Sequence, residues 1–545
     1  MRVKPVQLKK SNELVKDYVN LDHTILSYFD YEPFNVDKAR LNDLKERTFQ
    51  REKLVNVLHT MNRYWGASDE TLRQIERLED KNSVVVIGGQ QAGLLTGPLY
   101  TLNKIISLLI LAKNKEDELN VPVIPVFWIA GEDHDYDEIN HIHAKRSNHQ
   151  KLYKHKSPQQ LFLKQSITSV QIDHGKMTEW IQQAFHDLQE TTYTKDLYET
   201  ITTCLKNAET YVDFFARLIF AIFPTEGLVL FDSGNPEIRQ MERDVFKQLI
   251  TNQQKISEAV YETVQVLHQK GYDLSLEVEK DDAHLFYHDE NNERILLKRD
   301  DDRWIGKNEE VELSTEQLLH FAENHPEKLS NNVVTRPIMQ EVLFPTLAFL
   351  GGDGEISYWS ALKKAFRAFD SNLKMPPVLP RLSFTYVTNR IEKLLKETVL
   401  DPKYVLDHGV DTVRMNWLLS QQSPPIETLF NETKQQMEQI HLPLRQLAQS
   451  VSTDLEEEAQ KNLRFIQKHL AHLQQKTEKK LAEKYEQKLA HYDEIGISLK
   501  PNQLLQERVW SPLPFFNEYG IDFLHELLEV QSISFNSNHY LVYLD

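Results

Sequence analysis

Long apolar runs that end in turns alternate with helical periodicity over much of the chain. The runs cover residues 84–89 (VVVIGG), 121–131 (VPVIPVFWIAG) and 227–234 (GLVLFDSG), and helical stretches separate them. A strand that is apolar at every position is buried on both faces, as in a parallel sheet covered by helices. The same alternation returns at residues 333–369 and closes at 376–384. We therefore expect an α/β fold with a doubly wound parallel sheet.

Two other regions follow different patterns. Between residues 272 and 312 apolar and polar residues alternate with a period of two, which predicts a small antiparallel sheet. From 423 to 495 there is no glycine, and Glu, Gln, Lys and Leu dominate, which is typical of long helices. Together the patterns predict six segments: a helical N-terminal lead-in to the core (1–83), the first half of the core with a helical insertion (84–235), a connecting insertion with the antiparallel sheet (236–332), the second half of the core (333–422), a coiled coil (423–495) and a C-terminal segment that packs back on the core (496–545).

The predicted coiled coil leaves its own connectivity open. Apolar residues occur there with alternating spacings of four and three, at Ile440, Leu444, Leu447 and Val451, and again at Leu463, Ile466, Leu470 and Leu473. Between the two sets, Thr453 and Glu456 fit a capping box, so residues 425–495 fit either two antiparallel helices or one continuous helix. Unequal helices would leave Leu473 and Leu481 uncovered. We expect a second copy of the chain to cover them in a twofold homodimer, with packing against the chain's own core as the alternative.

Composition and charge limit the classes of function. The chain has 545 residues and a net charge of −18, which disfavours general binding to nucleic acid or anionic membranes. Its single cysteine, Cys204, excludes a disulfide or a thiolate zinc cluster within one chain, and we expect a small buried side chain there. The N-terminal residues lack the apolar region of a signal peptide, and no segment has 18 unbroken apolar residues. We therefore expect a cytoplasmic protein.

The first candidate site is the glycine-rich turn GGQQAGLLTGP at residues 88–98, directly after a predicted strand. In a doubly wound sheet the ligand lies beyond the carboxyl ends of the strands, and amides at the start of the next helix would favour a carboxylate or phosphate. The spacing matches neither the dinucleotide-binding nor the P-loop pattern, and a tight turn without a ligand is the alternative. The candidate substrate-binding residues are Gly89, Gln90, Gln91, Gly93, Thr96 and Gly97.

The second candidate site is the acidic stretch GEDHDYDEINHIH at residues 131–143. It directly follows an apolar run, and its carboxylates would be costly to bury without partners, so we expect them to face the same cleft. The favoured interpretation is a catalytic or amine-binding cluster of Glu132, Asp133, His134 and Asp135. A divalent metal site formed by Asp133, His134, Asp135 or His141 and a solvated loop are the alternatives, and we predict no metal.

The third candidate site is a second glycine-rich turn, FLGGDGEISYW, at residues 349–359. Gly352, Glu355 and Tyr358 are placed to reach a ligand at the end of the strand before them. Arg336 lies upstream and Arg381 follows another short apolar run, and both are candidate substrate-binding cations. An arginine near a strand end is more often part of a structural ion pair.

In this order, GGQQAGLLTGPLYTLNK, FWIAGEDHDYDEIN, GLVLFD, RPIMQEVLFPTLAFLGGDGEISYW, VLPRLSFT and LLQERVW resemble the motifs of the bacillithiol-biosynthesis cysteine-adding enzyme family, BshC. The resemblance covers nearly the full length. It implies a Rossmann-like core of the nucleotidylyltransferase and class I synthetase type, with insertions and a C-terminal α-helical coiled coil that forms a homodimer.

The resemblance also implies a carbon–nitrogen ligase that joins L-cysteine to the glucosamine amine of glucosaminyl-malate to form bacillithiol. ATP or another nucleotide is a possible cosubstrate, although the HIGH and KMSKS signatures of related folds are absent. In this hypothesis the first turn binds malate or phosphate and residues 132–135 hold ammonium groups. His134 is the candidate base because an unperturbed imidazole has a pKa of about 6.5. The alternatives are a nucleotidylyltransferase or adenylating ligase for another small acid, and a non-catalytic coiled-coil scaffold or sensor.

Overall fold

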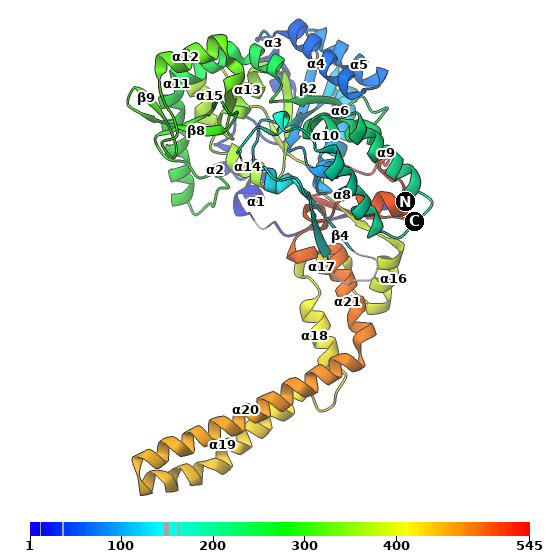
Figure 1. Ribbon diagram of the computed structural model, residues 1–545, viewed down its shortest axis with the longest axis vertical. Coiled ribbons are helices and arrows are strands. Elements are labelled where there is room, and N and C mark those ends of the chain that lie inside the picture. Colours follow the sequence, from blue (N-terminus) through cyan, green and yellow to red (C-terminus); the bar gives the residue numbers. More distant parts are fainter. Residues whose placement is uncertain (11, 35–36, 146–151, 162) are drawn as a thin grey trace. The chain divides into compact units, whose positions relative to one another are not determined.

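The computed structural model describes residues 1–10, 12–34, 37–145, 152–161 and 163–545 (Figure 1). These residues form two compact units. The first contains Met1–Tyr386 and Gln506–Asp545, and the second contains Val387–Leu505. No helix among the described residues is long and apolar enough to span a membrane.

A five-stranded parallel sheet forms the centre of the first unit. Its order is β13-β12-β2-β3-β6, and each neighbouring pair is parallel. The chain therefore moves outward from β2 through β3 to β6, and then returns to the other side of β2 with β12 and β13. This reversal between β2 and β12 is the topological switch point of a doubly wound sheet. The predicted fold is confirmed, with strands β2 (Val84–Gln90), β3 (Val123–Ile129), β6 (Val229–Asp232), β12 (Thr346–Gly351) and β13 (Val378–Pro380).

The first core strand shows why its sequence ends in glycines. Val84 to Ile87 are buried, as expected of a strand covered on both faces. A Cβ atom on Gly88 would lie 2.9 Å from the carbonyl oxygen of Leu350, and one on Gly89 would lie 2.6 Å from that of Trp128. These glycines are needed because the neighbouring strands approach so closely, whether or not a ligand is present.

Helices surround the sheet. Helix α6 packs on β2 and β3, α4 packs on β6, and α3 packs on β12. The helices of this unit are α1 (Glu13–Val19), α2 (His23–Leu26), α3 (Asp37–Lys45), α4 (Arg51–Trp65), α5 (Asp69–Glu76), α6 (Tyr100–Leu119), α7 (Tyr136–Ile139), α8 (His174–His186), α9 (Thr194–Lys206), α10 (Tyr211–Ile222), α11 (Pro236–Gln269), α12 (Thr315–Asn324), α13 (Thr335–Leu343), α14 (Asp353–Trp359), α15 (Lys363–Phe369), α22 (Leu513–Tyr519) and α23 (Phe523–Leu528). Short 3₁₀ helices include η2 (Leu94–Thr96) and η6 (Gln506–Arg508).

The antiparallel sheet expected between residues 272 and 312 is present. It begins at β7 (Asp282–His288), later than the alternating pattern suggested, and continues with β8 (Arg294–Asp300), β9 (Arg303–Gly306) and β10 (Glu312–Ser314). A fifth strand, β11 (Leu329–Asn331), pairs with β7. Elsewhere β4 (His141–Lys145) pairs with β5 (Leu152–Lys156), and the chain ends meet in a sheet of β1 (Arg2–Val6), β15 (His539–Tyr543) and β14 (Phe384–Val387).

Apart from Val387, the last residue of β14, the regular elements of the second unit are helices. Its helices are α16 (Asn389–Thr398), α17 (Pro402–His408), α18 (Asp411–Ser420), α19 (Ile426–Val451), α20 (Thr453–Lys484) and α21 (Glu486–Leu499). Helices α19 and α20 lie side by side, so the hairpin is the observed form and the continuous helix is excluded (Figure 1). The N-cap of α20 is Ser452, whose Oγ accepts a hydrogen bond from the Leu455 amide. The predicted capping box of Thr453 and Glu456 therefore begins one residue too late.

The two leucines expected to be uncovered differ. Leu473 is exposed, but Leu481 is buried in a cluster with Leu418, Ile426 and Leu489. The expectation for Leu481 is wrong because Leu418, which lies before the predicted hairpin, and Leu489, which lies in the separate helix α21, join Ile426 in covering it.

Candidate functional site

A cleft of about 430 Å³ lies at the carboxyl ends of β2, β3 and β12, at the switch point of the sheet. Residues from α6, α14, the loop after β11 and η6 also contribute to its lining. The cleft brings together ten of the residues proposed from sequence as substrate-binding or catalytic: Gly89, Gln90, Gln91, Glu132, Asp133, Arg336, Gly352, Glu355, Tyr358 and Arg381.

The remaining five candidates, Gly93, Thr96, Gly97, His134 and Asp135, are not among the residues that line the cleft. A Cβ atom on Gly93 would lie 2.7 Å from Gly97 Cα, and Gly97 has a φ of 74°. These two glycines are therefore needed for the tight backbone of the turn itself.

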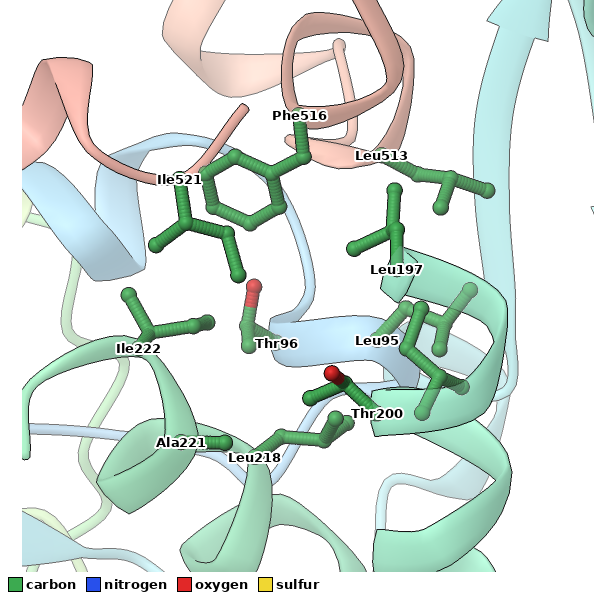
Figure 2. Close-up of a pocket in the computed structure, with 11 residues that line it drawn as sticks. Leu95, Thr96, Leu197, Thr200, Leu218, Ala221, Ile222, Leu513, Phe516 and Ile521 are labelled. Atoms are coloured by element: carbon green, nitrogen blue, oxygen red, sulfur yellow. The ribbon is translucent and has the colours of Figure 1, made fainter. Parts of the chain in front are cut away.

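Thr96 faces a different environment. It lines a small apolar pocket of about 20 Å³, and Figure 2 shows its hydroxyl pointing into the space between Ile222, Phe516 and Ile521. Among the described residues, no group accepts or donates a hydrogen bond at Thr96 Oγ1, although the side chain is buried. Apart from Thr96, the only hydroxyl among the lining residues is that of Thr200, which donates to Asp196 O at 2.8 Å.

The glycine-rich turn uses several of its amides internally. The Gly93 amide donates to Gln91 O, the Gly97 amide to Leu94 O, and the Leu99 amide to Trp510 O. The backbone donors of Gly93, Gly97 and Leu99 are therefore not available to an anion, because they already have acceptors.

Lys104 holds the two glycine-rich turns together. Its Nζ donates to Gly89 O at 2.7 Å, to Gln90 Oε1 at 3.3 Å and to Glu355 Oε2 at 2.6 Å. Glu355 Oε2 also accepts from the Gly352 amide at 2.7 Å. Burial lowers the pKa of Lys104, and the Glu355 carboxylate opposes that shift. The turn after β2 and the turn after β12 are thus joined across the switch point by an ion pair between buried Lys104 and half-buried Glu355.

The acidic stretch after β3 separates into a buried part and a cleft-facing part. Glu132 is buried and accepts from Arg239 Nη2 at 2.6 Å and from the Asn331 amide at 3.1 Å. Arg239 also pairs with Glu242 at 2.6 Å. Burial raises the pKa of Glu242 to about 7, although Arg239 counteracts this. Glu132 is therefore anchored by α11 and β11, and its proposed contact with an ammonium group stays a prediction.

Arg294 determines the hydrogen bonding of Asp133 and His134, the two residues that follow Glu132. Its Nη1 lies 3.1 Å from Asp133 Oδ1 and 3.1 Å from His134 Nδ1. Because a guanidinium can only donate, Nδ1 of His134 is an acceptor, and the neutral ring then carries its proton on Nε2. Burial and the charge of Arg294 lower the pKa of His134, and Nε2 lies 3.8 Å from Asp135 Oδ1. His134 is thus held neutral with its free nitrogen already protonated.

Glu138 is a cleft residue that the sequence did not single out. It lies in the short helix α7 and is exposed overall; partial burial of its carboxylate and the neighbouring Asp135 raise its pKa, while a hydrogen bond from Gln91 lowers it. A carboxylate whose pKa is raised accepts a proton more readily near neutral pH. Its position five residues after Asp133 was visible in the sequence, but nothing there distinguished it from Asp137.

Arg381 and Arg336 both line the cleft but have different partners. Arg381 pairs with buried Glu507 through two nitrogens, at 2.8 and 3.0 Å. Burial alone would raise the pKa of Glu507, but Arg381 lowers it to about 2. Arg336 donates to Gln340 at 3.0 Å and to the Tyr358 hydroxyl at 3.2 Å, both neutral. Arg381 therefore forms the structural ion pair that is common for arginines near strand ends, and Arg336 does not.

Sequence reasoning missed several cleft residues, namely Tyr100, Lys104, Glu138, Asn331, Asn332 and Arg508. Lys104 lies within the motif GPLYTLNK and Arg508 within LLQERVW. Both motifs carry the family resemblance, but neither residue was predicted to belong to the site. Across the described residues, no three His, Cys, Asp or Glu side chains are arranged to hold a metal ion.

These features define an α/β protein with a Rossmann-like core, a charged cleft at the switch point and a helical hairpin. The chain belongs to the BshC family: residues 1–382 match "Bacillithiol biosynthesis BshC, N-terminal Rossmann-like domain", and residues 384–544 match "Bacillithiol biosynthesis BshC, C-terminal coiled-coil domain". The family and the fold expected from the sequence motifs are confirmed.

Full-length relatives agree with this membership. A protein of Oceanobacillus iheyensis is 39% identical over 547 residues, with 100% of each chain covered. One of Bacillus cytotoxicus is 40% identical over 532 residues, with 97% of this chain and 98% of the relative covered. One of Geobacillus sp. (strain WCH70) is 39% identical over 549 residues, with 100% of each chain covered. Each bears the name "Putative cysteine ligase BshC".

Proposed function

We propose that this protein is a cysteine ligase that joins the carboxyl group of L-cysteine to the glucosamine amine of glucosaminyl-malate, the last step of bacillithiol formation. Its relatives' names support the reaction class. The observation that carries the proposal is the cleft at the switch point, where carboxylates after β3 and guanidinium groups from α13 and η6 face one cavity. Such a cleft suits two substrates that together carry ammonium and carboxylate groups.

The proposed chemistry is attack of the glucosamine nitrogen on the carbonyl carbon of an activated cysteine. The amine loses a proton, and the activating group leaves with the electron pair of its bond to that carbon. An amide does not form readily from a free carboxylate in water, so a nucleotide or another activating cosubstrate is required. Such a cosubstrate would be held by the residues that line the cleft.

Glu138 is the base that the geometry favours for this reaction. It lines the cleft, and burial raises its pKa. His134, the candidate from sequence, is less suited because Arg294 occupies Nδ1 and leaves a protonated Nε2. Asp133 lines the cleft, with Oδ1 paired to Arg294 at 3.1 Å and Oδ2 accepting from Gln91 Nε2 at 3.3 Å, and in this proposal its remaining acceptor capacity holds the ammonium group of a substrate.

The reaction is tested by incubating purified protein with glucosaminyl-malate, L-cysteine and ATP, omitting each in turn, and detecting bacillithiol by mass spectrometry. Product that depends on both small substrates is the expected result, and its dependence on ATP identifies the activating cosubstrate. Folded protein that forms no product with ATP or another nucleoside triphosphate would contradict the proposal.

The assignment of the base is tested with Glu138→Gln. We expect kcat to fall by about 100-fold or more, since general-base catalysis contributes roughly 10² to 10⁴. Asp137→Asn is the matched control, because Asp137 is not among the residues that line the cleft and its carboxylate pairs with Lys156 at 2.7 Å. His134→Gln should reduce kcat less than Glu138→Gln, and the reverse order would restore His134 as the base.

We also propose that the hairpin mediates a homodimer. The stripe Ile440, Leu444, Leu447 and Val451 is exposed on α19, each residue by 59–71%. Helix α20 packs elsewhere on α19, for example where His441 Nε2 meets Asn462 Oδ1 at 3.1 Å and Lys434 Nζ meets Gln474 Oε1 at 3.0 Å. The same stripe on a second copy is a partner of matching chemistry, since a twofold dimer pairs identical surfaces.

A further inference from the structure

Most charged side chains of the cleft are already neutralised by a protein partner. Two of its cations and four of its carboxylates take part in close ion pairs: Lys104 with Glu355 at 2.6 Å, Arg381 with Glu507 at 2.8 Å, Glu132 with Arg239 at 2.6 Å, Asp133 with Arg294 at 3.1 Å and Asp353 with Lys10 at 2.7 Å. A paired side chain has less charge to offer a ligand than an unpaired one. The cations of the cleft that have no carboxylate partner are therefore the better candidates for binding an anionic ligand.

Two guanidinium groups of the lining have no carboxylate partner among the residues that the structure describes. Arg336 contacts the neutral groups of Gln340 and Tyr358 and lies over the rings of Trp128 and Phe349. Arg508 is exposed, lines the cleft, and has neither a hydrogen bond nor an ion pair within the described part of the chain. An arginine in a concave site with no internal partner is free to bind a carboxylate with two parallel hydrogen bonds.

The segment that carries Arg508 is fixed on both sides. Its neighbour Glu507 is buried and accepts hydrogen bonds from Arg381, Asn103 Nδ2 at 2.6 Å and Ser383 Oγ at 2.7 Å. Gln506 Oε1 accepts from the Tyr386 amide at 2.7 Å. Within η6, the side chains before Arg508 thus anchor the backbone to the core, while Arg508 itself is exposed and lines the cleft.

The C-terminal side of the segment is equally fixed. Trp510 O accepts a hydrogen bond from the Leu99 amide at 2.9 Å, which ties the segment to the residue just before α6. Val509 and Trp510 are both buried. A guanidinium on such a support loses less conformational freedom on binding than one on a mobile loop. An exposed arginine that serves only solubility would not need this anchoring.

We propose that Arg508 is a specificity-determining residue that binds one carboxylate of a dicarboxylate-bearing acceptor, with Arg336 available for the other. This inference rests on the proposed function, in which the malate part of the acceptor carries two free carboxylates. With this assignment the acceptor's carboxylates bind on the side of the cleft formed by α13 and η6. The carboxylates that follow β3 are then available for ammonium groups of the substrates.

The test compares wild-type protein with Arg508→Gln and Arg508→Lys in steady-state kinetics. For Arg508→Gln we expect KM for glucosaminyl-malate to rise at least tenfold, while kcat and KM for cysteine change less than threefold. Arg508→Lys should restore part of the affinity. The preference for glucosaminyl-malate over a glucosaminide with a neutral aglycone should fall with Arg508→Gln. Arg243→Gln is the control, because Arg243 is an exposed arginine of α11 that does not line the cleft.

Calorimetric binding of L-malate and of glucosaminyl-malate separates this inference from the proposed reaction. Wild-type protein should bind glucosaminyl-malate, and Arg508→Gln should weaken binding at least tenfold. Weakened binding without any product in the wild type would uphold the role of Arg508 and reject the reaction. Product formation with unchanged KM and unchanged binding in Arg508→Gln would overturn the role of Arg508 and leave the reaction intact. Absence of binding to both ligands in the wild type would overturn the inference.

Discussion

The Rossmann-like unit and the α19–α20 hairpin depart from the usual distribution of side chains in opposite ways: the first buries charged residues, and the second exposes apolar ones. In the first unit the charged residues Glu132, Arg239 and Glu242 are buried together in one ion-pair cluster. In the hairpin, apolar residues such as Ile440 and Leu447 are more than 60% exposed. Burying a charged side chain costs free energy unless an opposite charge pairs with it. A contiguous apolar stripe exposed to water is typical of a surface that a partner covers. The comparison is what motivates the proposals of a preorganised site in the first unit and of a homodimer interface on the hairpin.

The largest expected effect is on assembly. In Ile440→Glu/Leu447→Glu the two charges would lie in the proposed interface of both copies, and we expect a dimer to become a monomer in light scattering at micromolar concentration. Fully burying one such side chain contributes roughly 1.5–3 kcal/mol, so four lost contacts exceed what an ordinary interface tolerates.

The control for assembly adds equal charge beside the stripe. Gln439 and Gln446 are exposed polar residues of the same helix, and Gln439→Glu/Gln446→Glu should leave the dimer intact. A monomeric wild type would end the interface interpretation of the hairpin, and a dimer that survives charges at 440 and 447 would place the interface elsewhere.

The next effect concerns the buried charges. Arg239→Leu leaves Glu132 and Glu242 buried without their cation, and we expect the free energy of unfolding of the first unit to fall by about 3–5 kcal/mol. Arg243→Leu on the same helix breaks a surface pair with Glu323 and should cost about 1 kcal/mol or less. Urea denaturation measures both, and equal losses would show that the buried cluster has no special role.

A smaller effect depends on pH. Burial raises the pKa of Asp232, at the end of β6, to about 7 from 3.8. The native state therefore holds a proton that the unfolded state has lost, so this contribution to stability is complete below pH 3.8 and disappears as pH rises through 7. Relative to Asp232→Asn, the wild type should lose about 1.4 kcal/mol per pH unit between pH 5 and 7, and nothing further well above 7. The measurement is denaturation of both proteins at several pH values between 5 and 7. A difference in unfolding free energy between wild type and Asp232→Asn that stays constant over this range would contradict the expectation.

The smallest effect concerns a polar group that the first unit buries without a partner. Thr96→Val removes a hydroxyl with no hydrogen bond and keeps the shape of the side chain, so we expect a change in unfolding free energy within about 1 kcal/mol and unchanged kinetics. Thr200→Val in the same pocket loses a hydrogen bond to Asp196 O and should be the more destabilising. Lost affinity for glucosaminyl-malate in Thr96→Val would return Thr96 to the substrate site.

The glycine-rich turn shows how far the site could be predicted from sequence. The position of GGQQ after an apolar run places Gly89, Gln90 and Gln91 at a strand end, and the structure has them in the cleft. Thr96, only five residues after Gln91, faces an apolar pocket instead. Spacing along a turn does not fix the direction of each side chain, because the backbone at Leu95 and Thr96 has positive φ values of 47° and 72°.

The hairpin shows the same limit at larger scale. Its helical character followed from composition and periodicity, because residues without glycine and with apolar positions three and four apart favour helices. The burial of Leu481 did not follow, since Leu418 and Leu489 belong to other helices. Likewise, the sequence showed an arginine in LLQERVW but not that Glu507 would be buried against Arg381 while Arg508 faces the cleft.

The sequence by itself determined the order of strands and helices, the parallel character of the core, the family and the existence of a long hairpin or helix, because these depend on local periodicity and on motifs. Tertiary structure alone decided which charged groups found partners. Glu132 meets Arg239 across 107 residues, Lys104 meets Glu355 across 251, and Asp133 meets Arg294 across 161. Such pairs depend on how the chain returns to the switch point, and the electrostatic state of each group is set by the neighbours that this return supplies.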